Sequence, residues 1–394
     1  MLLTINNLIL ITSILTCFYW SFFNLSRKNF FYRKISLTFT SCFILFLYNP
    51  LIIVILIIFT IYSYFCFLLA KKLKLFNIIW LIFIPLIISN FIDFNTIRLS
   101  SNYFGNPLSI FATNTFFLGF SYYSIKTFGS LKIFLKNNKF NLLDLTLSNI
   151  FYPTFACGPI NYSDNFSNVL FKSSFDKNLF ISGLIRLGHG ILKIILINTI
   201  LISKLSIFLF GKKYTDIDIN WQDTNLYFAI IFSVFSFVKL YVNFSAFTDI
   251  AVGIGQIFHI KIPENFNYPL LSHSIQNFWQ RWHLSLSHFI NVNIFIPLYR
   301  RTGNLYFSIY ITFIFAGLWH RVNLGYFLWG LFHGTALIFY YKFFKDESCL
   351  SKFPKISKIV GTFLTILFVS IVSTLANLNS NADISHYILS FFRI

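Results

Sequence analysis

The sequence predicts an all-α protein that crosses a lipid bilayer many times. Of its 394 residues, 56% are hydrophobic and 11% are charged, and the mean hydropathy is +0.70. Soluble domains carry about 25% charged residues, so this composition excludes an ordinary soluble fold. The apolar residues gather in runs of about 20, the length that a helix needs to cross a bilayer. We therefore expect one membrane-embedded domain over residues 1–394, with about ten or eleven crossing helices.

The apolar runs locate the individual spans. The first run, residues 1–23, has no Lys or Arg before it, which argues against a cleaved signal peptide and favours a membrane helix with its N-terminus outside. Residues 37–70 form a 34-residue run, which is too long for one crossing, so Asn49-Pro50 should divide it into two helices. Further spans are expected at 76–92, 107–123, 142–158, 178–206, 224–243, 305–320, 324–343 and 357–376. Loops are expected at 124–141, 159–177 and 207–223.

The formal charge of +19 comes from 31 Lys and Arg against 12 Asp and Glu. In a soluble protein this excess would suggest nucleic acid as a partner. Here the basic residues form short clusters beside apolar spans, such as "RKNFFYRK" within residues 26–35 and "KKLK" at 71–74. The positive-inside rule explains such clusters as cytoplasmic anchors. We therefore expect membrane lipid and no nucleic acid as partner, with an acidic carrier protein or anionic lipid as a further option.

The stretch 244–300 departs from this pattern. Its 57 residues include "SAFTDIAVGIG", "KIPENFNYPL" and "FWQRWHLSLSHF", and they contain no polar-free span of about 20 residues. Polar or non-helical backbone is tolerated at membrane depth only where protein buries it or where it lines a wet cavity. We therefore expect short broken or re-entrant helices around a cavity.

The polar cluster "FWQRWHLSLSHF", residues 278–289, admits two interpretations. On a continuous helix Phe278, Trp282, Ser285 and Phe289 would share one face, with His283 at the border of the polar side. This pattern is typical of an amphipathic helix at the membrane interface with Trp and Arg anchors. The alternative is a functional site, because ionisable residues within membrane segments usually mark a pathway or a site.

A second cluster, "AGLWHRVNLGYFLWGLFHG", favours the functional alternative. It places His320 at the end of one apolar span and His333 inside the next, so the two should lie on different helices. The sequence has no HExxH, no GxSxG elbow and no Walker loop. Its five cysteines are widely spaced without a CxxC, so they predict neither a metal site nor a disulfide framework. Histidine then remains as an acid, a base or an orienting donor, which fits direct acyl transfer to an alcohol.

The same region resembles a known family. The matching text is "NFSAFTDIAVGIGQIFHIKIPENFNYPLLSHSIQNFWQRWHLSLS" (243–287), "FIPL" (295–298), "GLWH" (317–320) and "WGLFHG" (329–334), with weaker echoes at "LGFSYYS" (118–124), "ACGPI" (156–160) and "GLIRLGHGILK" (183–193). These motifs resemble the membrane-bound O-acyltransferases, in the branch of alginate O-acetylases and teichoic-acid D-alanyl transferases. The resemblance covers roughly residues 118–345.

The resemblance implies roles for particular residues. His320 matches the catalytic histidine of the family, and His283 matches the second histidine of its "WH" motif. A ring of helices would surround a channel that the donor enters from the cytoplasm and the acceptor from the other face. The residues expected to line this channel are Trp279, Arg281, Ser287, Trp319, Arg321 and His333.

Two positions depart from the family pattern. Relatives commonly have Gly where this chain has Arg321, and "RD" where it has Asn291-Val292. A positive charge beside His320 would favour the neutral, basic form of its imidazole. Arg321 could instead crowd the channel, which would alter the substrate or abolish activity.

The function expected from the resemblance is transfer of a short acyl group, acetyl above all, from a thioester donor to hydroxyls of an extracytoplasmic cell-envelope polysaccharide. No cofactor and no metal are expected, because acyl-CoA or an acyl carrier is a substrate. The expected location is the bacterial cytoplasmic (inner) membrane, with a periplasmic or carrier protein as an optional partner. D-alanyl transfer from a carrier protein to teichoic acid is the first alternative. A transporter and a non-catalytic membrane scaffold are the others.

Overall fold

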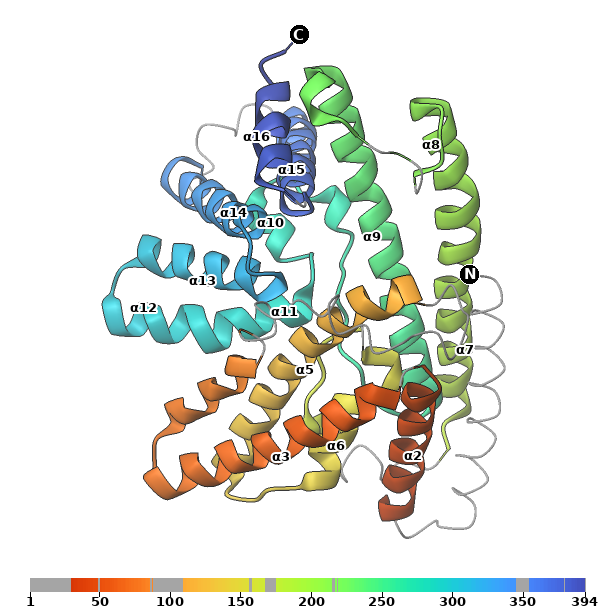
Figure 1. Cartoon of the computed structure of the whole chain (residues 1–394), viewed down its shortest axis with the longest axis vertical. Coiled ribbons are helices and arrows are strands. Elements are labelled where there is room, and N and C mark those ends of the chain that lie inside the picture. The colour runs from red at the N-terminus through yellow and green to blue at the C-terminus, as the bar shows by residue number, and fades with distance from the viewer. Residues whose placement is uncertain are drawn as a thin grey trace. The chain divides into compact units, whose positions relative to one another are not determined.

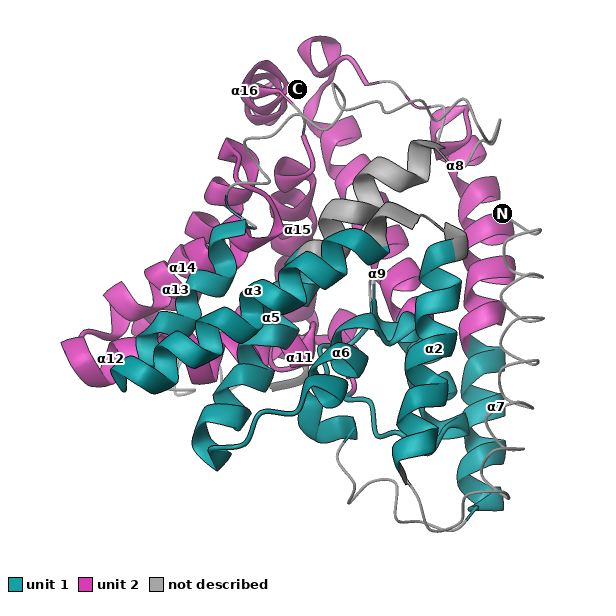
Figure 2. Ribbon diagram, turned by 60° about the horizontal axis from the view of Figure 1, so that its bottom comes forward, with its two compact units in different colours: residues 1–189, 248–263 teal, residues 190–247, 264–394 magenta. Residues whose placement is uncertain are grey.

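The computed structural model describes residues 30–48, 50–85, 87, 109–155, 158–166, 175–214, 217, 219–344, 354–378 and 380–393. All regular elements in these ranges are helical. The chain forms two compact units, shown in different colours in Figure 2: unit 1 comprises residues 1–189 and 248–263, and unit 2 comprises 190–247 and 264–394. Helices α7 (Lys177–Leu192) and α9 (Leu226–Ile257) each begin in one unit and end in the other.

The described residues of unit 1 form four further α-helices and three shorter 3-10 segments. Their bounds are α2 Phe30–Tyr48, α3 Pro50–Leu73, α5 Ser109–Asn137 and α6 Leu142–Ile150, with 3-10 helices at Phe76–Phe83, Tyr152–Thr154 and Ser163–Phe166. The predicted division at Asn49-Pro50 is confirmed, because α2 ends at Tyr48 and α3 begins at Pro50.

Unit 2 alternates long helices with short broken ones. Its elements are a π-helix Lys193–Leu201, α8 Ile202–Phe210, a 3-10 helix Trp221–Asp223, the first part of α9, a 3-10 helix Pro269–Leu271, α10 Ile275–Trp279, α11 Leu284–Ile290, a π-helix Asn291–Phe295, α12 Ile296–Thr302, α13 Leu305–His320, α14 Leu324–Phe343, α15 Pro354–Ala376 and α16 Asn381–Ser390. The short elements between Pro269 and Thr302 confirm the broken helices predicted there.

Four helices of the described chain are long and apolar enough to cross a membrane: Ile53–Leu73, Lys177–Phe210, Leu226–Ile257 and Ser357–Ala376. The shorter Leu305–His320 is also apolar. Helices at five of the predicted spans, 178–206, 224–243, 305–320, 324–343 and 357–376, are confirmed. The number of crossings stays a prediction. The predicted span at 1–23 lies outside the described residues, and so does most of the second half of the predicted span at 76–92.

Three predicted boundaries are wrong. The loop at 124–141 is helical up to Asn137, the span at 142–158 ends at Ile150, and the helix that begins near 224 continues to Ile257. Helix α5 keeps its polar residues inside because Lys126, 0% exposed, donates hydrogen bonds to the carbonyl oxygen of Thr154 at 2.6 Å and to its Oγ1 at 2.9 Å. Helix α6 ends at Ile150 because Phe151, with ψ +104°, leaves the helical conformation before the 3-10 helix Tyr152–Thr154.

The basic cluster of α2 does not lie wholly at an interface. Lys34 is 4% exposed and Asp144 of α6 is 7% exposed, and the Lys34 ammonium donates to the Asp144 carboxylate at 2.5 Å. A buried charge is stable only when it is paired. This part of the predicted cytoplasmic anchor is therefore an internal ion pair that joins α2 to α6.

Helices α13 and α14 lie side by side in unit 2 (Figure 1) because glycines let their backbones approach closely. A Cβ on Gly317 of α13 would collide with the carbonyl oxygen of Tyr326 in α14. A Cβ on Gly330 of α14 would lie 2.5 Å from the carbonyl oxygen of Phe313. Small residues are the usual solution where membrane helices pack without a hydrophobic driving force.

Replacing Gly317 with Ala should destabilise the protein, because a methyl group cannot fit against the Tyr326 backbone. Overpacking of this kind costs about 1–3 kcal/mol. The melting temperature of the detergent-solubilised protein, followed by its monodisperse peak in size-exclusion chromatography, should fall. Gly188→Ala in α7 is the control, because nothing lies within 4 Å of a Cβ there. An unchanged melting temperature for Gly317→Ala would show that the two helices do not depend on this contact.

Candidate active site

His283 lies in a sharp turn between α10 and α11. Helix α10 ends at Trp279 and α11 begins at Leu284, and His283 adopts a left-handed conformation with φ +45° and ψ +54°. The continuous amphipathic helix considered for 278–289 is therefore wrong. A non-glycine residue in this region is strained and persists only where its surroundings hold it.

Asn265 holds this turn, and sequence reasoning did not single it out. It is 0% exposed, its backbone oxygen accepts the N–H of Leu284 at 2.9 Å, and its Oδ1 accepts the hydroxyl of Ser285 at 2.6 Å. The bonds lie on both residues that follow His283. Asn265 belongs to the "KIPENFNYPL" stretch, where the lack of a polar-free span predicted irregular backbone but did not point to a particular residue.

Two residues expected to line the channel also brace the same turn. The Ser287 hydroxyl donates to the carbonyl oxygen of Trp282 at 3.1 Å. Arg281 donates from Nη1 to the carbonyl oxygen of Asn267 at 3.2 Å, and its own carbonyl oxygen accepts the Asn267 N–H at 2.9 Å. These bonds give Arg281 and Ser287 a structural role, and their predicted place in the channel stays a prediction.

His320 is the last residue of α13 and is exposed. Three aromatic rings surround its imidazole: Trp319 at 4.6 Å, Tyr326 stacked at 5.5 Å with an interplanar angle of 25°, and Trp329 edge-on at 6.0 Å. Trp319 itself is 3% exposed. His320 thus combines an exposed position at the end of α13 with an imidazole held by aromatic rings, which suits a side chain that acts on a substrate.

The two histidines expected to be catalytic both lie in unit 2. His283 is 2% exposed, and its ring lies 4.9 Å from that of Phe244 in α9. A charge on His320 acts electrostatically on His283. The sequence placed both in one channel by resemblance alone, and the structure brings the buried and the exposed imidazole within electrostatic reach of each other.

His333 of α14 is 1% exposed and lies on the apolar side of this site. Its imidazole contacts Trp329 at 4.6 Å and Trp279 at 5.2 Å, and its Nδ1 has no hydrogen-bond partner within the described ranges. Trp329 contacts both His320 and His333. His320 and His333 are on different helices, α13 and α14, as predicted.

Arg321 follows α13 in extended conformation, with φ −163°, and is exposed. Its charge acts on Tyr326, the residue that stacks on His320. Asn291 and Val292, the second departure, open the π-helix Asn291–Phe295. Among the residues that the structure describes, no group of three or more His, Cys, Asp or Glu side chains gathers as metal ligands would.

A family comparison accounts for this arrangement. The model of the MBOAT, membrane-bound O-acyltransferase, family matches residues 113–381. This chain belongs to the membrane-bound O-acyltransferase family. The match contains the region of residues 118–345 that the motifs marked, with both histidines of the site.

Curated relatives match this chain over limited stretches. The peptidoglycan O-acetyltransferase of Helicobacter pylori is 42% identical over 105 residues, 25% of this chain and 19% of the relative. The probable alginate O-acetylase AlgI of Pseudomonas fluorescens is 31% identical over 204 residues, 50% of this chain and 38% of the relative. The teichoic acid D-alanyltransferase of Streptococcus thermophilus is 25% identical over 251 residues, 60% of this chain and 59% of the relative. The matched stretches thus span less than two thirds of each relative's length.

Ser285→Ala should destabilise the His283 turn, because it leaves the buried Oδ1 of Asn265 without its hydrogen bond. An unsatisfied buried acceptor costs about 1–3 kcal/mol. Thermal unfolding in detergent measures the loss. Ser385→Ala is the control, because the exposed Ser385 hydroxyl bonds only its own helix backbone at Asn381. Equal melting temperatures for the two variants would contradict the role assigned to Asn265.

Proposed function

We propose that this protein is an integral membrane O-acyltransferase that moves a short acyl group, acetyl, from a thioester donor to hydroxyls of an extracytoplasmic cell-envelope polysaccharide. Family membership supports acyl transfer. The names of the relatives from Helicobacter pylori and Pseudomonas fluorescens support acetyl as the acyl group and an envelope polysaccharide as the acceptor. The observation that carries the proposal is the exposed, ring-held His320, which lies within electrostatic range of the buried His283.

In the proposed mechanism the neutral imidazole of His320 is the general base. It accepts the proton of the acceptor hydroxyl while the hydroxyl oxygen forms a bond to the carbonyl carbon of the thioester. The carbon–sulfur bond then breaks, and the thiolate takes the proton back from His320. The aromatic rings of Trp319, Tyr326 and Trp329 fix the plane of the imidazole. The entropy cost of orienting the base toward the hydroxyl is therefore small at the moment of reaction.

His283 is proposed to orient or polarise the reacting groups. His283 lies in a left-handed turn, and the hydrogen bonds of Asn265 to Leu284 and Ser285 hold this turn in place. The position of the buried imidazole is therefore fixed before substrate binds. A preorganised donor or dipole in a water-poor site stabilises the charge that develops on the carbonyl oxygen more strongly than water does. Strained backbone at such a position is typical of functional sites.

The proposal places the protein in the bacterial cytoplasmic membrane, with the donor supplied from the cytoplasm as acyl-CoA or as an acyl carrier. The four apolar spans support membrane insertion. A periplasmic or carrier-protein partner is part of the proposal, because donor and acceptor are separated by the bilayer. Trp279, Trp319, Arg321 and His333 are proposed to shape the substrate path, since each lies on or next to the rings around the two histidines.

D-alanyl transfer to teichoic acid is the second candidate. It is favoured by the similarity to the teichoic acid D-alanyltransferases of Bacillus subtilis, 32% identical over 144 residues, and of Streptococcus thermophilus. A labelling experiment distinguishes the two candidates. Membranes that contain the protein are incubated with either radiolabelled acetyl-CoA or radiolabelled D-alanine charged on a carrier protein, and label in the polysaccharide fraction is measured. Label from acetyl-CoA in the polysaccharide fraction supports the first candidate. Label only from the charged carrier supports the second.

His320→Ala should abolish acyl transfer while the protein still inserts and accumulates. Loss of a general base typically lowers the rate by about 10²–10⁴-fold. The measurement is the rate of label transfer at equal protein amounts. His189→Ala is the control, because His189 is an exposed histidine of α7. Near-wild-type transfer by purified His320→Ala would remove His320 from the mechanism.

A further inference from the structure

Unit 2 contains a polar pocket of about 610 Å³ that the proposed catalytic residues do not line. Its walls are the first part of α9, the C-terminal end of α15, the start of α16 and the segment before α9. Ser236, Lys239 and Asn243 of α9 line one wall. Spacings of three and four residues put these side chains on one face of the helix.

This polar face is unusual in a helix long and apolar enough to cross a membrane. Polar groups in such helices are costly and normally face a bundle interior or a water-filled cavity. The Ser236 Oγ is buried without a hydrogen-bond partner in the described part of the chain. Lys239 forms no ion pair with a described residue, and its ammonium lies 3.4 Å from the ring centroid of Tyr214. These groups are available to a ligand.

The opposite wall adds amide, hydroxyl and carboxylate groups. Ser373, Thr374 and Asn377 come from α15, and Asp383 comes from the first turn of α16. Asp383 binds the Ser380 hydroxyl at 2.6 Å through Oδ2, which leaves its other oxygen for a ligand. One cation, one carboxylate and several neutral hydrogen-bonding groups thus converge on the same space.

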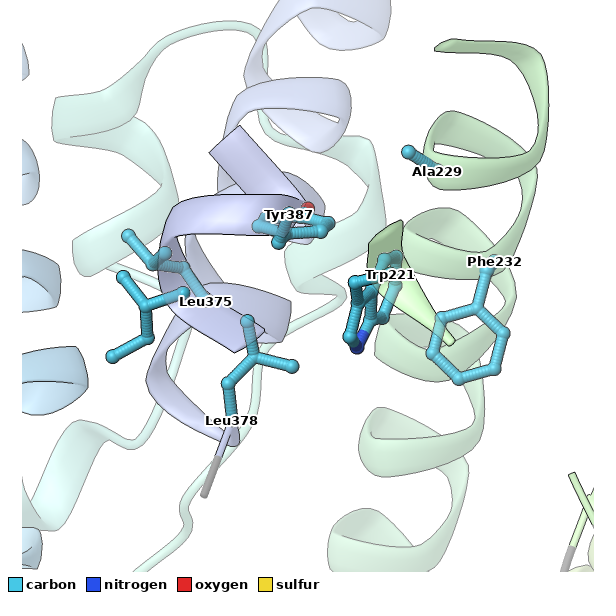
Figure 3. Packing of buried hydrophobic residues seen from close by; sticks show 7 residues of the cluster. Trp221, Ala229, Phe232, Leu375, Leu378 and Tyr387 are labelled. Carbon is cyan, nitrogen blue, oxygen red and sulfur yellow. The ribbon is translucent and has the colours of Figure 1, made fainter. Parts of the chain in front are cut away.

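Aromatic and aliphatic side chains complete the pocket. Trp221, Phe232 and Leu378 line it and also belong to a packed cluster that joins α9, α15 and α16 (Figure 3). This cluster packs directly behind the walls. Few well-placed polar groups on a firm apolar base are typical of small-ligand sites. The negative faces of aromatic rings also attract the C–H faces of sugar rings.

Basic residues also border the pocket. Lys212 and Lys213 directly precede Tyr214, which lines it, and both lysines are exposed. Arg393 donates from Nη1 to the carbonyl oxygen of Trp221, another lining residue, at 3.4 Å. This positive charge around the pocket favours an anionic ligand.

The pocket also connects to the site of the two histidines. Tyr326 donates a hydrogen bond from its hydroxyl to the Oδ1 of Asn377 at 3.4 Å. The ring of Tyr326 stacks on His320 with centroids 5.5 Å apart. A ligand that contacts Asn377 is therefore separated from the His320 imidazole by one side chain.

We propose that this pocket binds an acidic saccharide segment of the acceptor polymer, with Lys239 pairing with a sugar carboxylate and Ser236, Asn243 and Asp383 bonding hydroxyls. That the saccharide is the acyl acceptor rests on the proposed function, whereas its binding to the pocket does not. Charge-assisted hydrogen bonds favour carboxylate at Lys239 over a neutral hydroxyl.

Binding is tested with the purified full chain in lipid nanodiscs and a fluorescently labelled oligosaccharide of mannuronic acid, followed by fluorescence anisotropy. Wild type should bind saturably and prefer this probe to a neutral cello-oligosaccharide. Lys239→Met should weaken binding at least about tenfold, since hydrogen bonds to charged groups are worth about 1.5–3 kcal/mol. Asp383→Asn and Ser236→Ala should weaken it less. Lys204→Met, at an exposed lysine of α8, should bind as wild type.

Three results would overturn the proposal: unchanged affinity in Lys239→Met, equal binding of the neutral probe, or binding of a poly(glycerol phosphate) oligomer but not of the acidic sugar. Should Lys239→Met not fold, Ser236→Ala decides, because its hydroxyl has no partner to lose. Failure of the pocket and failure of the transferase are distinguishable. Wild type that binds the saccharide but transfers no acyl group contradicts the proposed transferase and leaves the pocket in place. Wild type that transfers the acyl group but does not bind the saccharide contradicts the pocket alone. His320→Ala should still bind the saccharide.

Discussion

The structure depends on one constraint: polar groups in a chain this apolar must find partners within the protein. In a bilayer an unsatisfied backbone or side-chain polar group costs several kcal/mol. Lys34 pairs with Asp144, Lys126 is bound by Thr154, and Arg186 pairs with Asp249 at 2.5 Å in unit 1. Each bond joins segments distant in sequence. The polar residues that look like interruptions in the apolar runs are thus the links between helices.

The same constraint shapes the candidate site. Two polar side chains of the "FWQRWHLSLSHF" motif, Arg281 and Ser287, bond backbone next to the left-handed turn at His283. Ser285 is fixed by Asn265 from the preceding segment. His320 differs, because aromatic rings rather than hydrogen bonds surround it and it stays exposed. The motif therefore serves as a frame for two imidazoles.

Close helix packing sets the position of His320. Gly317 and Gly330 let α13 and α14 approach, and this contact brings Tyr326 and Trp329 of α14 to the His320 ring. The aromatic residues were visible in the sequence. Their contact with His320 depends on two helices and could not be read from either one.

The apolar runs predicted α13, α14 and α15, because a helix that crosses a bilayer needs about 20 apolar residues. The run at 37–70 is too long for one crossing, and this length predicted the break at Pro50. The apolar runs failed for α5 and α6, where the buried partner of Lys126 is 28 residues away along the chain. The two candidate catalytic histidines came from motif resemblance. Asn265 and Tyr326 did not, because nothing in their local sequence shows that they hold His283 and His320.

The central claim is that His320 and His283 together flank the reacting carbonyl. The most direct measurement is a cryo-EM structure in lipid nanodiscs with a thioether analogue of the acetyl donor, which cannot transfer its acetyl group. The account predicts the acetyl carbonyl carbon between the two imidazoles, with room for a hydroxyl oxygen about 3–3.5 Å from it on the His320 side. An acetyl group bound elsewhere, with neither imidazole in contact, would contradict it.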